Sequence, residues 1–179
     1  MADFHLTPTP AIPDRPVEAG STRLAPVEVA GIHTIVLPPN NPPRLEEEFE
    51  KHVGPLPQIG RSSDAPDGAL VLRPTRERAY LVGPGRSARP AATFYGLDQT
   101  GFWAAIELTG PGARQVLERN WRPDPGDGAF PAGAVTRSSI AQVPIILARR
   151  CAQTYLLLAP RSYAQSVFHT LAVSMRWVL

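Results

Sequence analysis

Apolar residues recur every three to four positions in three segments of the chain, a spacing typical of helices with one buried face. The first segment follows Asn41 and ends before Gly54, the second opens at the Thr-Gly-Pro sequence 109–111, and the third starts at Ser162. Ser162 and Gln165 have the spacing of a capping box. We therefore predict three helices, with buried positions at Leu45, Phe49, Val53, Ala113, Val116, Leu117, Ala164, Val167, Phe168, Leu171, Ala172, Met175 and Val178.

Short apolar and β-branched runs, bounded by Pro, Gly and polar residues, predict strands. Two of these runs flank the polar turn 74–78, and two others flank a short turn around Cys151 and Gln153, so each pair is expected to form a β-hairpin. The residues between 54 and 68 and between 83 and 96 are rich in turn formers and are expected to be loops. The expected strands are 32–37, 69–72, 79–82, 102–108, 134–141, 145–149 and 154–159.

The order of these elements nearly repeats along the chain. Each half reads as a strand, a helix and a strand pair, and only the second half ends in an additional helix. Hairpins give antiparallel pairing, and an apolar sheet face must be covered by another layer. We predict an α+β fold of two pseudo-repeated strand-helix-strand-strand units, with a largely antiparallel sheet.

Proline is unevenly distributed. Of the 21 prolines, nine precede residue 44 and none follows Pro160. Residues 1–25 show no periodicity, so we expect an extended proline-rich arm that is ordered mainly by a partner. Residues 26–179 are expected to form one folded domain.

The charge pattern gives little indication of function. The formal net charge is +2, and Lys51 is the single lysine among 18 Lys and Arg residues. A preference for arginine fits either a partner-facing surface or a bias in codon composition. Arginines cluster at positions 73, 76, 78, 86 and 89, but only Tyr80 lies nearby and no nucleic-acid motif accompanies them, so we predict no nucleic-acid binding. Without a signal segment, a membrane-length apolar run or a second cysteine, the chain is expected to be cytoplasmic and not membrane-bound.

Candidate chemistry is sparse. His5, His33, His52 and His169 are scattered and lack metal-ligand spacing. Cys151 follows two arginines that would lower its pKa, but an ordinary surface thiol is the preferred interpretation. The Gly-Pro-Gly sequences 83–85 and 110–112 are read as turns, because their prolines lack the N–H that a phosphate loop would use.

No catalytic, cofactor-binding or metal-binding residue is therefore predicted on this chain. Large aromatic residues are normally buried, but together with arginine they also anchor protein interfaces. Trp177 lies two residues from the end of the sequence, where little core remains to bury it. We expect Trp177 to be an interface residue.

Several segments resemble the gamma subunit of heterotetrameric sarcosine oxidase in their order and spacing, over about residues 97–171. Upstream the match is weaker, because residues 83–96 are shorter than the long helix usual in that family. The resembling segments are 98–101 (DQTG), 104–108 (AAIEL), 109–114 (TGPGAR), 129–133 (AFPAG) and 157–164 (LLAPRSYA).

The resemblance implies a fold similar to the folate-binding domain of aminomethyltransferases of the glycine cleavage system. In that superfamily an acidic pair opens the strand that corresponds to the one near Ile145, and here Val143 and Pro144 hold those positions. The family's complexes oxidatively demethylate secondary N-methyl amines. FAD, FMN, NAD and tetrahydrofolate are expected on the partner subunits and not on this chain.

Two function hypotheses follow from the resemblance. The first is a non-catalytic structural subunit of a sarcosine oxidase, or of a related enzyme such as N-methylglutamate dehydrogenase, with alpha, beta and delta partners and alpha as the main contact. Such a chain belongs to an oxidoreductase without supplying its catalytic residues. The alternative is a stand-alone tetrahydrofolate-binding or aminomethyltransferase-like protein. A third and weaker hypothesis is an arginine-mediated nucleic-acid binder.

Overall fold

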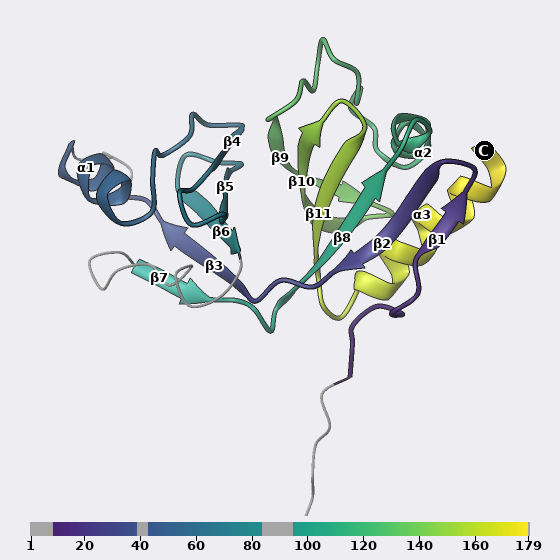
Figure 1. The fold of residues 1–179 in the computed structure, drawn as a ribbon, viewed down its shortest axis with the longest axis horizontal. Helices are drawn as coiled ribbons and strands as arrows, with labels where there is room; N and C mark the ends of the chain where they lie inside the picture. The colour runs from purple at the N-terminus through teal and green to yellow at the C-terminus, as the bar shows by residue number, and fades with distance from the viewer. Residues whose placement is uncertain (1–8, 39–42, 84–94, 179) are drawn as a thin grey trace, which may run out of the picture.

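The computed structural model describes residues 9–38, 43–83 and 95–178. Two antiparallel sheets pack face to face, and helices cover their outer faces (Figure 1). From left to right in Figure 1 the layers are α1, a five-stranded sheet, a six-stranded sheet, and the pair α2 and α3. The predicted α+β class with largely antiparallel sheets is confirmed.

The six-stranded sheet has the order β1-β2-β8-β11-β10-β9. Its outer face is covered by α2 (Ala113–Asn120) and α3 (Ala164–Val178). The predicted hairpin around Cys151 is confirmed as the antiparallel pair β10 and β11. The strands are β1 (Val17–Ala19), β2 (Thr22–Val27), β8 (Trp103–Thr109), β9 (Val135–Ile140), β10 (Val143–Cys151) and β11 (Thr154–Pro160).

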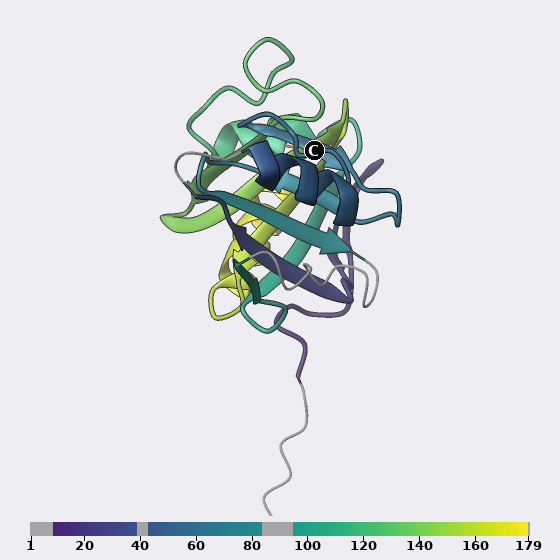
Figure 2. The ribbon, with the colours of Figure 1, turned by 90° about the vertical axis from the view of Figure 1, so that its left-hand side faces the viewer.

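The five-stranded sheet has the order β4-β5-β6-β3-β7, and α1 (Pro43–His52) covers its outer face, as Figure 2 shows from that side. The predicted hairpin across 74–78 is confirmed as β5 paired with β6. Asn41, after which the first helix was expected to begin, lies outside the described residues. The strands are β3 (Gly31–Val36), β4 (Arg61–Asp64), β5 (Leu70–Arg73), β6 (Arg78–Gly83) and β7 (Tyr95–Asp98).

The pseudo-repeat is present. In the first unit β4 adds a strand to the predicted pair after the helix, and in the second unit the three strands after the helix lie where strands were expected, at 134–141, 145–149 and 154–159. The first unit runs β3-α1-β4-β5-β6, and the second runs β8-α2-β9-β10-β11. In each sheet the unit's three later strands lie in chain order beside its first strand. The fifth strand comes from outside the unit, because β7 pairs with β3 and β2 pairs with β8. The chain therefore crosses between the sheets twice, after β2 and after β7 (Figure 1).

Three apolar layers form the core. One lies between the helices α2 and α3 and the six-stranded sheet, one between the two sheets, and one beneath α1. The central strand β10 contributes alternately to two layers, since Ile145 and Leu147 face the helices while Ile146 and Ala148 face the other sheet. Burial on both faces explains why such strands read as continuous apolar runs in the sequence.

The expectation of an extended arm is wrong for residues 17–25. β1 and β2 form a hairpin, and β2 pairs with β8 so that Leu24 lies opposite Leu108, both fully buried. Ile12 is also buried against the helix-side core. β2 pairs with β1 only as far as Leu24. Pro26 lies beyond that pairing, so its missing N–H removes no hydrogen bond to β1, and the proline is tolerated within the strand.

Two expected loops also contain strands. β4 lies within the expected loop 54–68, and its polar sequence Arg-Ser-Ser-Asp gave no apolar signal. Most of the expected connection 83–96 lies outside the described residues, and its last two residues begin β7. Within the described ranges, none of the helices has the length and hydrophobicity needed to span a bilayer.

Candidate functional site

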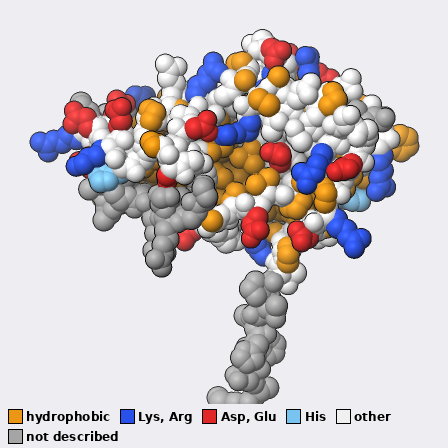
Figure 3. Space-filling model, viewed as in Figure 1, with side chains coloured by type: hydrophobic (Ala, Val, Ile, Leu, Met, Phe, Trp, Pro, Cys, Tyr) orange, Lys and Arg blue, Asp and Glu red, His pale blue; other side chains and the backbone are white. Residues whose placement is uncertain are grey.

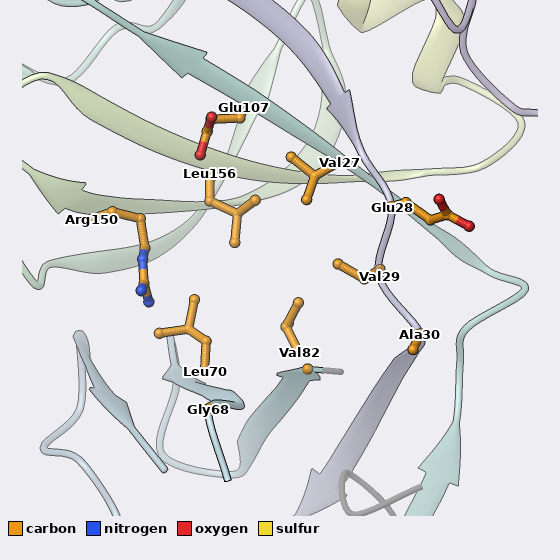
Figure 4. Close-up of a pocket in the computed structure, with 11 residues that line it drawn as sticks. Val27, Glu28, Val29, Ala30, Gly68, Leu70, Val82, Glu107, Arg150 and Leu156 are labelled. Atoms are coloured by element: carbon orange, nitrogen blue, oxygen red, sulfur yellow. The ribbon is translucent and has the colours of Figure 1, made fainter. Parts of the chain in front are cut away.

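A cleft of about 480 Å³ lies at the margin of the apolar layer between the two sheets. Figure 3 shows it as a hydrophobic hollow between the two halves of the molecule. One wall comes from Leu70 and Val82 of the five-stranded sheet, and the facing wall from Leu156 of β11. Val27, the last residue of β2, and Val29, on the connection from β2 to β3, close one end (Figure 4). The walls of the cleft are thus an accessible extension of the core.

Glu107 interrupts this apolar lining. On β8 the residues Trp103 and Ala105 face the other sheet, and strand alternation puts Glu107 on the same face. Its neighbours across the sheet are Leu156 of β11 and Ala25 of β2. Its half-buried carboxylate reaches into the cleft (Figure 4) and has no hydrogen bond or ion pair in the described part of the chain.

Arg150 lies on the opposite side of the cleft, and its charge is already balanced. Arg150 Nη2 lies 3.2 Å from Asp64 Oδ1, an ion pair that joins β10 to β4. Leu156 lies between Arg150 and Glu107 in the close-up (Figure 4). Glu28 is exposed at the rim. The unbalanced charge inside the cleft is therefore negative, in a chain whose formal net charge is +2.

A second candidate surface is formed by exposed aromatic residues where the segment before β8 meets the segment before α3. Phe102 and Tyr163 are 51% and 55% exposed, and Arg161 N donates to Phe102 O at 2.7 Å. The Arg161 guanidinium donates to the carbonyl of Thr9, which ties the start of the described chain to this surface. Two aromatic rings beside an arginine are a combination typical of protein interfaces.

The three tryptophans divide as the sequence suggested. Trp103 and Trp121 are buried, and their indole N–H groups donate to Gln99 Oε1 (3.1 Å) and Ser138 Oγ (2.7 Å) respectively. Trp177 is 74% exposed on α3. Its role as an interface residue stays a prediction, but a large apolar side chain is available there.

The predicted arginine cluster does not form one surface in the described residues. Arg73 is buried, and its Nη1 donates to Pro57 O at 3.1 Å, so it serves the fold. Arg76 and Arg78 are exposed, and residues 86 and 89 lie outside the described ranges. Nothing in the sequence pattern indicates that Arg73 is internal.

Cys151 is exposed at the β10–β11 hairpin, and its pKa is lowered. The main cause is a hydrogen bond from the side chain of Thr154, followed by backbone hydrogen bonds, with a smaller contribution from the charge of Arg149. The predicted direction is confirmed, but the hydroxyl of Thr154 has a larger effect than the arginines. Among the described residues, no three His, Cys, Asp or Glu side chains are grouped so that they could hold a metal ion.

The turn at 110–112 serves the fold, as its sequence indicated. Gly110 has φ 115°, and Gly112 N donates to Thr22 Oγ1 at 2.9 Å, so this amide is already used by the N-terminal hairpin. The other Gly-Pro-Gly sequence lies mostly outside the described residues.

Val143 and Pro144 start β10, directly after the turn at 141–142. Val143 packs at the edge of the helix-side core and Pro144 is exposed. Neither side chain can take or hold a proton. The chain therefore lacks carboxylates at the two positions where the resemblance places the acidic pair for folate chemistry, and these residues do not fit that role.

Comparison with known proteins supports the fold. No protein-family model and no curated protein matches the chain. A chain of the heterotetrameric sarcosine oxidase from Corynebacterium sp. U-96, solved with pyrrole 2-carboxylate, superposes with a TM-score of 0.76 at 20% identity, covering 90% of this chain and 88% of that one. The glycine cleavage system aminomethyltransferase T from Bartonella henselae gives a TM-score of 0.58 at 16% identity.

The two comparisons differ in how much of the other protein is matched. The aminomethyltransferase match covers 79% of this chain but 42% of that protein, so this chain spans less than half of its length. The match to the sarcosine oxidase chain is nearly complete in both directions. The fold is therefore that of a chain of heterotetrameric sarcosine oxidase and of part of an aminomethyltransferase, as the sequence resemblance implied.

Proposed function

We propose that this protein is a non-catalytic structural subunit of a heterotetrameric flavin-dependent sarcosine oxidase, or of a related N-methyl amino acid oxidase or dehydrogenase. The observation that carries the proposal is the nearly complete match, in both directions, to one chain of such a heterotetramer. This chain and the sarcosine oxidase chain share one fold over nearly their whole lengths, which is most simply explained if they are equivalent subunits. The aminomethyltransferase, by contrast, is a larger protein of which this chain matches only a part.

The surface of the chain supports a role in an assembly. Phe102, Tyr163 and Trp177 each keep at least half of their surface exposed. Large aromatic side chains next to arginine contribute strongly to binding when a partner removes them from water. A subunit that is permanently assembled would bury these residues in its interfaces.

The apolar residues at positions 143 and 144 support the non-catalytic role. On this proposal FAD, FMN, NAD and tetrahydrofolate are bound by the partner subunits, and the secondary N-methyl amine substrate reacts there. The alpha subunit is the main contact, with beta and delta subunits completing a cytoplasmic complex. This chain would then contribute to the stability of the complex and not to the reaction.

Reconstitution tests the proposal. The chain is co-expressed with the genes that flank it in its own genome, and amine-dependent oxygen consumption is measured with and without it. We expect an assembled oxidase only when the chain is present, and kcat unchanged by Val143→Ala. A stable oxidase that assembles equally well without this chain would contradict the proposal.

The fold match to an aminomethyltransferase favours a second candidate, a stand-alone tetrahydrofolate-binding protein. Isothermal calorimetry of the isolated chain with tetrahydrofolate separates the two. Heat of binding with a stoichiometry of one would support the folate-binding candidate. Absence of heat would leave the structural subunit as the supported function.

A further inference from the structure

We infer that the cleft between the sheets is a docking site for a basic side chain of a partner subunit. In this arrangement an extended segment of the partner inserts a lysine or arginine, flanked by apolar residues, and the cation pairs with Glu107. The inference rests on the proposed function and specifies one of the contacts that such a subunit would make.

Glu107 lies where the fold would normally bury an apolar side chain. It occupies an inward-facing position of β8, between the apolar neighbours Ala25 and Leu156, where strand alternation would otherwise place a core residue. Burying a carboxylate without a partner is unfavourable. No described residue compensates this group, so burying Glu107 completely would be unfavourable unless a partner supplied the opposite charge. A partner cation would explain why the position is acidic.

The charges that line the cleft do not cancel. Arg150 is the cation within it, and its guanidinium is held by Asp64 at 3.2 Å. Glu107 is left as the unbalanced charge inside the cleft, and Glu28 adds a further negative charge at the rim. The cleft is therefore complementary to a cation, although the chain as a whole is formally positive.

The shape and lining of the cleft suit a long basic side chain. Lysine and arginine bury their alkyl stems along apolar surfaces and bring only the charged end to a carboxylate. Leu70 and Val82 on one wall and Leu156 on the other provide such surfaces. The volume of about 480 Å³ is within the range of pockets that hold a ligand larger than one side chain, so flanking apolar residues can fill the remainder.

A partner segment fits these observations better than a second copy of the chain. The cleft opens on a face of the molecule where its apolar floor is directly visible (Figure 3). A protruding segment of a larger subunit can reach the apolar lining formed by Val27, Val29 and Leu156, whereas a broad, flat surface cannot. Self-association and small-molecule binding remain outcomes of the test.

The test uses the co-expressed complex and compares Glu107→Gln with the wild type. Removing one member of a buried charge pair typically weakens an interface strongly. We expect the dissociation constant of the variant subunit from the complex to rise about tenfold or more, and Glu107→Lys to prevent assembly. Glu118→Gln is the matched control, because Glu118 is exposed on α2 and pairs with Arg114 at 2.7 Å. This control should leave the dissociation constant unchanged.

A second measurement separates docking from a structural role. Glu107→Leu should raise the melting temperature of the isolated chain, because the unpaired carboxylate is replaced by an apolar side chain, while it weakens the complex. A residue retained for the fold would show a lower melting temperature. Loss of stability in Glu107→Leu together with unchanged assembly of Glu107→Gln would overturn the inference.

The remaining outcomes are equally decisive. A wild-type complex that binds Glu107→Gln as tightly as the native subunit overturns the docking site and leaves the proposed function intact. Failure of the wild-type chain to assemble at all removes the proposed function and the inference with it. A homodimer of the isolated chain, or tetrahydrofolate binding, that is lost in Glu107→Gln assigns the cleft to another occupant and overturns the inference.

Discussion

Arg149 and Asp127 form an ion pair of 2.6 Å, although the arginine side chain is 3% exposed and the aspartate side chain is 84% exposed. The guanidinium also stacks over the ring of Tyr155 at 5.5 Å from its centre. Arg149 therefore ties the loop after α2 and the β10–β11 hairpin to the sheet. Its remaining hydrogen bonds go to the carbonyl oxygens of Pro125 (3.4 Å), Phe130 (2.8 Å), Cys151 (3.2 Å) and Ala152 (2.7 Å).

Replacing Arg149 should cost far more than replacing its carboxylate partner. Arg149→Met leaves four carbonyl oxygens without this donor, two of them in buried hydrogen bonds, and we expect the free energy of unfolding to fall by about 3 kcal/mol. Asp127→Asn removes an exposed charge, and a loss below about 1 kcal/mol is expected. Urea denaturation followed by circular dichroism measures both. Equal losses would show that the ion pair, and not the carbonyl network, is the stabilising element.

Gly110 should not tolerate a side chain. A Cβ atom at this position would lie 2.3 Å from Ser21 O and 2.7 Å from Thr22 Cα, and the φ of 115° is itself unfavourable for other residues. Gly110→Ala would push the N-terminal hairpin away from β8, and we expect a loss of at least about 2 kcal/mol in unfolding free energy.

The control for Gly110 is Gly128→Ala, since a Cβ at Gly128 meets no atom within 4 Å. Its melting temperature should match that of the wild type. A Gly110→Ala protein as stable as this control would mean that the β1–β2 hairpin is not firmly seated on the sheet.

The turn between β9 and β10 stores strain that substitution can release. Ala141 and Gln142 have φ values of 49° and 67°, a conformation that favours Asn and Gly. Replacing the pair by Asn-Gly should raise the free energy of unfolding by about 1 kcal/mol. Gly133 has a φ of 79° and open space around it, so Gly133→Ala introduces backbone strain without a clash and should lower the melting temperature. Thermal unfolding measures both variants, and a melting temperature that shifts in the same direction for the two would contradict this explanation.

The reactivity of Cys151 should depend on Thr154. The hydrogen bond from the Thr154 side chain stabilises the thiolate and so lowers the pKa of Cys151. Thr154→Val should therefore raise this pKa and slow alkylation by iodoacetamide near neutral pH, with the difference disappearing at a pH above both pKa values. Thr109→Val is the control, because Thr109 Oγ1 lies 2.9 Å from Thr154 Oγ1 but is not among the causes of the lowered pKa. Identical pH profiles for all three proteins would rule out the role of Thr154.

Buried helices and strands could be predicted from the sequence, whereas short strands that form only by pairing with a neighbouring strand could not. β10 and β11 are apolar on both faces and the α3 pattern is long, so both were predictable. β1, β4 and β7 are three or four residues long and lie at sheet edges, where pairing with a longer strand and not composition determines their structure. A short polar edge strand is indistinguishable from a loop in sequence.

The cleft was predictable only in part. Glu107 is the one charged residue of the run 102–108, which is a visible signal. Its significance depends on which sheet face it occupies and on the engagement of Arg150 with Asp64, a residue 86 positions away in the chain. Contacts between residues so far apart in the chain are determined by how the two sheets pack, and they cannot be inferred from a single sequence.

Native mass spectrometry most directly tests whether this protein is a structural subunit. The tagged chain is purified from cells that co-express the genes flanking it, and the mass of the intact species is determined. The proposal predicts an assembly of four different chains that contains one copy of this 19.4 kDa chain. When the assembly dissociates, the flavins should remain bound to the larger chains. A 19.4 kDa monomer, or an oligomer of this chain alone, would contradict it.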